Sequence, residues 1–297
     1  MTPPPTPPWD RRSEDIGNII HLEHVNLQVP DQRLATAFYV SGLGLTRDPY
    51  LMTGVDNMWV NAGRTQFHLP TGPAQRLRGR VGLVVPDHAA LQQRLRRVQP
   101  VLQGTAFAVS EHAQQVVATC PWGNTVCCHD PAAEPAYAAI GLGIAYVAFD
   151  VPLASAAGIA RFYQEVMGAP ASVATTPRGQ AVCSVQVGAV QTLRFEETAA
   201  DLPAYDGHHI QIYVANFSGP HRRLLARGLV TEESNAHQYR FEDIGDGAAG
   251  EATAPWFRIE HEVRSLRHPL YARPLVNRDP AQSNRDYRPG RDAFLPG

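Results

Sequence analysis

The feature that most constrains the fold of this chain is one unit that recurs four times, an apolar strand followed by an amphipathic helix. The copies are HVNLQVPDQRLATAFYVSGLGL (24–45), RVGLVVPDHAALQQRLRRV (80–98), YVAFDVPLASAAGIARFYQEVMGA (146–169) and HIQIYVANFSGPHRRLLARGL (209–229). Copies one and three share a Phe-Tyr pair shortly before a glycine, whereas copies two and four lack it. Internal repeats of this kind indicate stacked copies of one supersecondary unit. The higher unit is therefore a pair of copies.

Runs typical of β-strands follow each helix, at 57–70, 115–130, 180–197 and 237–243 with 255–263. A strand, a helix and about three further strands make a βαβββ module. The sequence thus predicts an α+β fold of four modules in two paired domains, 18–133 and 139–272. The join, DPAAEPAYAAIG, is rich in Pro and Ala and resembles a linker. We expect residues 1–17 to be a disordered Pro-rich lead and 273–297 an irregular C-terminal tail.

Composition excludes several classes of function. The formal charge of −2 gives no reason to expect nucleic acid or an anionic membrane as a partner. No apolar run approaches the roughly 20 residues that a membrane-spanning helix needs. The N-terminus has no apolar region typical of a secretory signal. The four cysteines show no CxxC spacing and no disulfide framework. A cytoplasmic protein with a small-molecule substrate is the expectation.

The arrangement resembles the vicinal oxygen chelate superfamily, which includes glyoxalase I, bleomycin-resistance proteins and extradiol dioxygenases. The stretches that carry the resemblance are HLEHVNLQVPD with FYVSGLGL, CPWGNTVCCHDP, and their echoes in the second half. It covers about 18 to 270. The resemblance implies paired modules that curl concave mixed sheets around a metal-holding cleft, with ligands from the first and last strands of modules. In glyoxalase-like members, each site combines the first module of one domain with the last module of the other.

Applied to this chain, that rule sorts eight strand residues into two sets. One site receives His24, His68, His209 and Glu260. The other receives Tyr146, Arg194, Arg80 and Cys127. Three imidazoles and a carboxylate suit a divalent ion such as Zn, Ni, Fe, Mn or Co. The second set brings two cations to one point, where a divalent ion would be repelled. We interpret it as a lost metal site, kept as structure or as an anion pocket.

Simpler interpretations compete with this one. A lone strand histidine is usually half-exposed or hydrogen-bonded, and the rivals nearby are His21, His208 and His261. Alternation turns His208 away from His209 and should turn His261 outward. Glu260 could instead be an exposed carboxylate paired with Arg258.

Alternation also predicts the rest of the cleft. Residues on the face of the metal set are expected to bind substrate: Asn26, Gln66, Gln211, Tyr213 and Arg258. Such a polar face suits a wet pocket better than an ordinary core.

The resemblance implies a metal-dependent lyase or isomerase of the glyoxalase/epimerase type, acting on a small oxygen-rich substrate. Glu260 would be the catalytic base. A histidine at position 68 departs from glyoxalase I, which usually carries a carboxylate or amide there, and this puts glyoxalase I activity itself in doubt. The alternatives are an Fe(II)-dependent dioxygenase of the same superfamily and a non-catalytic binder or antibiotic-resistance protein. A monomer would suffice for a complete site, and a homo-oligomer is compatible with the sequence.

Overall fold

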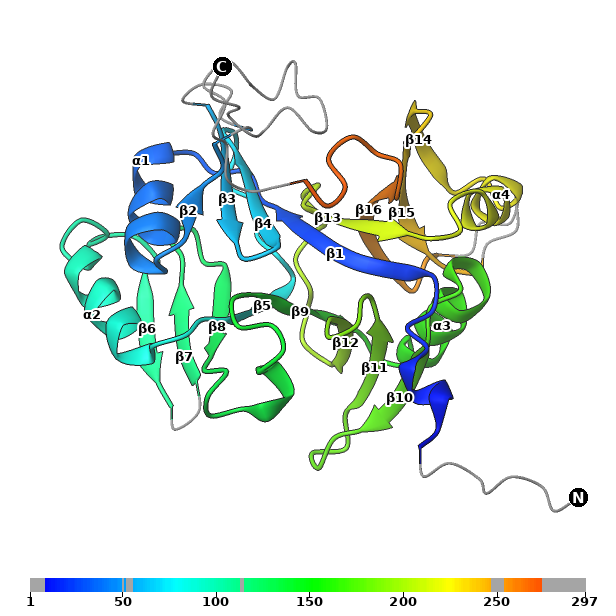
Figure 1. Cartoon of the computed structure of the whole chain (residues 1–297), viewed down its shortest axis with the longest axis horizontal. Coiled ribbons are helices and arrows are strands. Elements are labelled where there is room, and N and C mark those ends of the chain that lie inside the picture. Colours follow the sequence, from blue (N-terminus) through cyan, green and yellow to red (C-terminus); the bar gives the residue numbers. More distant parts are fainter. Residues whose placement is uncertain (1–8, 50, 52–55, 113–114, 247–253, 274–297) are drawn as a thin grey trace, which may run out of the picture.

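The protein contains two eight-stranded mixed sheets with helices at both ends (Figure 1). The structure is a computed structural model that describes residues 9–49, 51, 56–112, 115–246 and 254–273. All four predicted strand–helix units are present, each followed by three strands. The predicted α+β fold of βαβββ modules is therefore confirmed.

The bounds of the elements follow the four modules. The first contains β1 (Ile19–Asn26), α1 (Gln32–Ala35), the π-helical η2 (Thr36–Gly42), β2 (Thr46–Arg47), β3 (Asn57–Ala62) and β4 (Thr65–Pro70). The second contains β5 (Gly79–Val84), α2 (His88–Val98), β6 (Ala108–Glu111), β7 (Gln115–Thr119) and β8 (Thr125–His129). The third contains β9 (Gly143–Pro152), α3 (Ala156–Phe162), the π-helical η4 (Tyr163–Met167), β10 (Ala171–Thr175), β11 (Ala181–Gln186) and β12 (Thr192–Thr198). The fourth contains β13 (His209–Val214), α4 (Ser218–Ala226), β14 (Val230–Asn235), β15 (Gln238–Ile244) and β16 (Phe257–Ser265).

Each sheet joins one module from each of the two predicted domains. The first sheet combines modules one and four, and the second combines modules two and three. The first sheet has the order β14-β15-β16-β13-β1-β4-β3-β2, and the second has β10-β11-β12-β9-β5-β8-β7-β6. Within every module the first and last strands pair in parallel, and the two modules of a sheet join by their first strands, antiparallel. The segments 18–133 and 139–272 thus each give one module to each sheet, and the division into domains stays a prediction.

The recurring Val-Pro-Asp explains how two of the helices begin. Asp31 accepts hydrogen bonds from the first backbone amides of α1, and Asp87 does so at α2. These are N-caps, which satisfy amides that have no partner within the helix. In the two copies without this aspartate, other side chains supply the oxygen. Glu197 accepts from the amide of Ala156 at 2.8 Å, and Asn216 accepts from the amide of Gly219 at 3.0 Å.

One hydrophobic cluster runs through the molecule and includes residues of both sheets. The helices pack in pairs at the two ends, with α2 against η2 and α4 against η4 (Figure 1). The apolar side chains of both sheets are buried in this cluster, and the polar side chains lie on the opposite face of each sheet.

Most of the two terminal segments lies outside the described residues, and the expectations about them stay predictions. Within the lead predicted to be disordered, Arg11–Glu14 form a 3-10 turn (η1) capped by Asp10. Residues 1–8 and 274–297 are outside the described part of the chain. A second short 3-10 turn, η3 (Pro135–Tyr137), lies in the predicted linker. Among the described residues, no helix is long and apolar enough to cross a membrane.

Candidate metal centre

Strand register brings the predicted ligands of the first sheet into two adjacent rows. Asn26 of β1 lies opposite His68 of β4 on one side and His209 of β13 on the other. His209 in turn lies opposite Glu260 of β16. His24 lies two residues before Asn26 on β1. This register follows from the parallel and antiparallel pairings described above, so that four neighbouring strands present one polar face.

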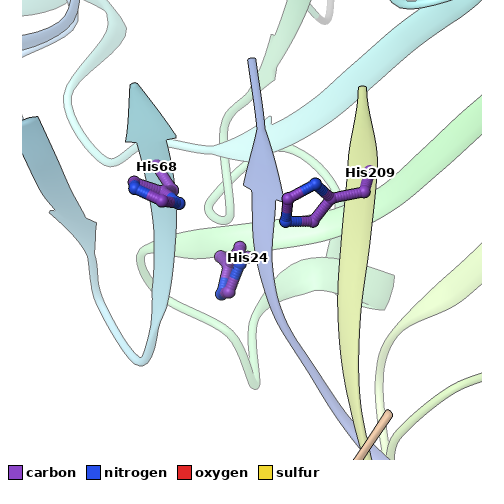
Figure 2. A group of neighbouring side chains, drawn as sticks. All are labelled: His24, His68 and His209. Atoms are coloured by element: carbon purple, nitrogen blue, oxygen red, sulfur yellow. The ribbon is translucent and has the colours of Figure 1, made fainter. Parts of the chain in front are cut away.

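His24, His68 and His209 form a compact group on that face (Figure 2). One ligand atom from each lies within 4.8 Å of those of the other two. The ring centroid of His24 is 5.9 Å from each of the other two rings. In the described part of the chain this is the one group of three or more His, Cys, Asp or Glu side chains close enough to hold an ion. The structure thus brings together three of the four predicted ligands.

In each of the three histidines, one ring nitrogen lies near an oxygen of a neighbouring side chain. Nδ1 of His24 lies 3.4 Å from a carboxylate oxygen of Glu23, and Nε2 of His68 lies 2.7 Å from Oδ1 of Asn57. Nδ1 of His209 lies 3.3 Å from a carboxylate oxygen of Glu260. Histidines that bind metals usually donate their second N–H to such an oxygen. The Nε2 atoms of His24 and His209 are buried and make no hydrogen bond among the described residues, although Nε2 of His209 lies 3.6 Å from a carboxylate oxygen of Glu262.

The protonation of the group also fits a metal centre. Burial lowers the pKa of His68 and of His209 well below the ordinary value for histidine, and the nearby cations Arg240 and Arg264 add to the effect. Both rings are therefore neutral near pH 7, which is the form that binds metal ions. The buried Nε2 atoms of His24 and His209, which make no hydrogen bond among the described residues, are not explained by an ordinary hydrogen-bonded core.

Glu260 lies beside the histidines and is held by an arginine. Its carboxylate is hydrogen-bonded to Arg240 of β15 and stands next to His209. Burial raises the pKa of Glu260, although the charge of Arg240 opposes the change. The alternative pairing with Arg258 is not what the structure shows, because Arg258 is exposed and binds Asp243 at 2.6 Å. The structure therefore leaves Arg258 outside the buried group.

The other predicted substrate residues divide in two. Asn26 and Gln211 are buried, and the Oδ1 of Asn26 and both amide atoms of Gln211 have no hydrogen-bond partner among the described residues. Gln66 instead donates to Asp48 at 2.8 Å, and the hydroxyl of Tyr213 donates to Glu23 at 3.3 Å. Asn26 and Gln211 thus keep free hydrogen-bonding capacity next to the histidines, while Gln66 and Tyr213 are engaged in protein contacts.

Sequence reasoning missed Glu23, Arg240 and Arg264, which surround the group together with Glu262. Glu23 binds Arg264 of β16 at 3.2 Å, Arg264 binds Glu262 at 2.5 Å, and Glu262 binds Arg240 at 2.6 Å. Burial alone would raise the pKa of Glu23, but the hydrogen bond with His24 and the charge of Arg264 outweigh it and hold that pKa at about 2. Alternation of β16 could have indicated Arg264, which follows Glu260 and Glu262 at even spacing.

The face that carries the histidines is covered by the chain itself, contrary to the expectation of a wet pocket. His24 is fully buried. The segment 266–273 lies over this face, where Leu270 packs on Leu51 and Trp59 and the ring of Tyr271 lies 4.8 Å from that of Tyr213. The ring of Trp59 stacks on His68 with centroids 3.8 Å apart. Hydropathy could not reveal this cover, because the segment that provides it has no regular structure.

The rival histidines have other partners. His21 binds the side chain of Gln191 at 2.9 Å, and His208 binds Asp206 at 2.6 Å just before β13 begins. His261 lies on the opposite face from Glu260, as alternation predicts, but it is buried against Tyr163 of η4 and does not face outward. The helices that cover this face of the sheet are the reason for the difference.

The second predicted set also meets on one sheet, without forming a metal centre in the described residues. Arg80 of β5 binds Glu196 of β12 at 2.6 Å. The guanidinium of Arg194 lies 3.9 Å above the ring of Tyr146, and Tyr146 contacts Cys127. Burial raises the pKa of Cys127, so that its thiol is protonated at neutral pH.

Comparisons with known proteins identify the fold. No protein-family model matches the sequence, and no curated protein matches it. Among solved structures, glyoxalase I from Zea mays matches with a TM-score of 0.57 and 11% identity, over 82% of this chain and 92% of that one. A "putative dioxygenase" from Bacillus subtilis subsp. subtilis matches with a TM-score of 0.54 and 14% identity, over 83% of this chain and 85% of that one.

The chain has the vicinal oxygen chelate fold. At this level of identity the likeness concerns the fold alone. It confirms the architecture predicted from the repeat, and the roles of individual residues in this vicinal oxygen chelate fold rest on the geometry described above.

Proposed function

We propose that this protein is a metal-dependent enzyme that acts on a small oxygen-rich substrate. His24, His68 and His209 would hold a divalent ion, with Glu260 as the adjoining carboxylate. The observation that carries the proposal is the convergence of three imidazoles, of which His24 and His209 are buried and have Nε2 atoms without a hydrogen bond among the described residues. A divalent ion bound there would supply a Lewis acid for a substrate that chelates it through neighbouring oxygens.

The chain's own residues would divide the remaining work. Glu260 has a pKa raised by burial, which favours a role as general base, and Arg240 holds it in place beside His209. Asn26 and Gln211 offer amide groups to a polar substrate. The segment 266–273 excludes water from the site. Proton transfer by Glu260 suits a lyase or isomerase of the glyoxalase/epimerase type, which is the function we favour.

A dioxygenase dependent on Fe(II) is the second candidate. The observation that favours it is the hydrogen bond between Arg240 and Glu260, which occupies the carboxylate that a lyase would need as its base. The fold match to a "putative dioxygenase" points the same way at the level of architecture. Three imidazoles are among the ligands that suit iron.

Metal analysis of the purified protein tests the proposal. We expect near-stoichiometric metal in the wild type and its loss in His24→Ala, His68→Ala and His209→Ala. His208→Ala is the matched control, since this neighbouring histidine binds Asp206, and it should retain the metal. Protein that stays free of metal after loading with Zn, Ni, Fe, Mn and Co would overturn the proposal.

Two further measurements divide the enzyme classes. Oxygen consumption by the Fe(II)-loaded protein on a panel of catechols and α-hydroxy ketones identifies a dioxygenase, and turnover without oxygen identifies a lyase or isomerase. Glu260→Gln should abolish turnover in the second case, because a neutral amide cannot accept the proton, while retaining most of the bound metal through the three histidines.

A further inference from the structure

The second sheet carries a pocket that the proposed metal centre does not use. It has a volume of about 480 Å³ and lies over β11 and β12, with the turn η3 forming part of its wall. Its polar lining comes from Ser172 of β10, Ser184 and Gln186 of β11, Gln191 just before β12, Thr192 and Arg194 of β12, and Tyr137 of η3. Among the described residues, no aspartate or glutamate lines it, and Arg194 is its one charged side chain. The pocket therefore combines a largely apolar wall with a single positive charge.

Arg194 has no carboxylate partner among the described residues. Among the described residues its side chain makes one hydrogen bond, from Nη2 to the hydroxyl of Tyr137 at 3.3 Å, whereas a guanidinium has five N–H donors. Arg80, on the same face of the same sheet, is neutralised by Glu196 at 2.6 Å. A half-buried cation without a counter-charge is costly. This contrast indicates that Arg194 is kept for a partner outside the chain.

The guanidinium is held in a fixed place. It lies 3.9 Å above the ring of Tyr146. The hydroxyl of Tyr146 lies 3.0 Å from Nε2 of His129, whose Nδ1 lies 2.8 Å from Glu134. Beneath the ring, Gly82 leaves room that a Cβ atom would fill, since an added Cβ would lie 2.0 Å from Tyr146. The ring is thus a rigid platform, and Arg194 is positioned before any ligand arrives.

We propose that this pocket binds a small organic anion, with its carboxylate or phosphate group on Arg194. Planar guanidinium groups recognise both kinds of oxyanion through paired hydrogen bonds. Ser184 lies directly opposite Arg194 in the sheet, and the buried hydroxyl of Thr192 has no hydrogen-bond partner among the described residues. Both can donate to the same anion. Ala145 and Val190 line the remainder and fit an apolar body.

This site is separate from the metal centre, because the two lie on different sheets. Isothermal titration calorimetry tests anion binding by this pocket. The protein is first freed of metal by a chelator, and the three probes share a phenyl ring. Benzoate and phenyl phosphate carry an anionic head, and benzyl alcohol is neutral. We expect at least one of the two anions to bind and benzyl alcohol to bind at least tenfold more weakly. Equal binding of the alcohol, or no binding of either anion, would overturn the proposal.

Three variants test whether the anion binds in this pocket or elsewhere on the protein. Arg194→Gln should weaken anion binding at least tenfold. Ser184→Asp should do the same while leaving Arg194 on its tyrosine, because it places a carboxylate opposite the guanidinium and neutralises it. Arg178→Gln, an exposed arginine in the turn between β10 and β11, should bind like the wild type. If both Arg194→Gln and Ser184→Asp bind normally, or if His209→Ala loses binding, the assignment to this pocket is wrong.

Discussion

Glu23 and His24 are neighbours in sequence, yet both side chains lie on the same, polar face of the first sheet. Strand β1 uses eight residues, Ile19–Asn26, to pair with the six of β13, and one of its irregularities places Glu23 and His24 together opposite Gln211. Such a bulge breaks the alternation of the strand. As a result Glu23 contacts Nδ1 of His24 and also Tyr213 and Arg264. The bulge gives His24 a carboxylate that regular geometry would have turned away.

The first prediction follows from that contact. Glu23→Gln removes the charge that orients the His24 ring, and carboxylate partners of metal-binding histidines typically contribute about 10–100-fold in metal affinity. We expect a loss of that size in a competition titration of zinc against a chelator. Glu165→Gln, at an exposed position on η4, is the control and should not change the affinity. Unchanged affinity in Glu23→Gln would show that His24 is oriented without its neighbour.

A second prediction uses Trp59 as a reporter of binding. Its ring stacks on His68 at 3.8 Å, so an ion on His68 brings positive charge to the face of the indole. Zinc, which has no redox chemistry, should therefore change the tryptophan fluorescence of the wild type. Trp59→Phe should abolish this response while retaining zinc, and Trp122→Phe should keep the response. A response carried by Trp122 would place the ion outside the histidine group.

Much of the fold could be predicted from the sequence, because the repeat fixes which strands are first and last in each module. Alternation along β13 placed His209, Gln211 and Tyr213 on one face, and the pairing of β1 with β13 brings that face to His24. The bulge that recruits Glu23 has no signal in hydropathy, since it depends on how two strands of unequal length align.

The limits of prediction at the site have similar causes. Arg240 holds Glu260 from a neighbouring strand, and this contact depends on the register of β15 against β16, which apolar patterning does not fix where both strands carry charges. Likewise, the cover over the histidines comes from an irregular segment, and His261 is buried because helices lie on its side of the sheet. Contacts between elements decided each of these outcomes.

A third prediction concerns acid sensitivity of the metal-free protein. Burial lowers the pKa of His261 to about 4, so the folded protein disfavours a proton that the unfolded chain binds at about 6.5. The stabilisation is complete above pH 6.5 and is lost as the pH falls toward 4, at about 1.4 kcal/mol per pH unit for this one group. His261→Gln should show a correspondingly flatter decline in unfolding free energy between pH 6.5 and 4. His112→Gln, at an exposed site, should follow the wild type; a decline equally steep in His261→Gln would assign the sensitivity to other groups.

The last prediction concerns Gly82→Ala, a change of one methyl group that should affect the anion pocket and leave the metal centre unchanged. Gly82 of β5 faces the ring of Tyr146, and the Cβ of alanine would lie 2.0 Å from it, so the ring must move. Overpacking of this kind typically costs about 1–3 kcal/mol. Gly82→Ala should therefore lower the thermal stability and, by shifting the platform under Arg194, weaken benzoate and phenyl phosphate binding, while zinc affinity stays at the wild-type value. Gly104→Ala, where a Cβ has open space, tests the effect of a glycine change alone, although its positive φ of 80° adds strain of its own. Loss of zinc affinity in Gly82→Ala would show that the two sheets communicate, against the independence of the sites that their separate strands imply.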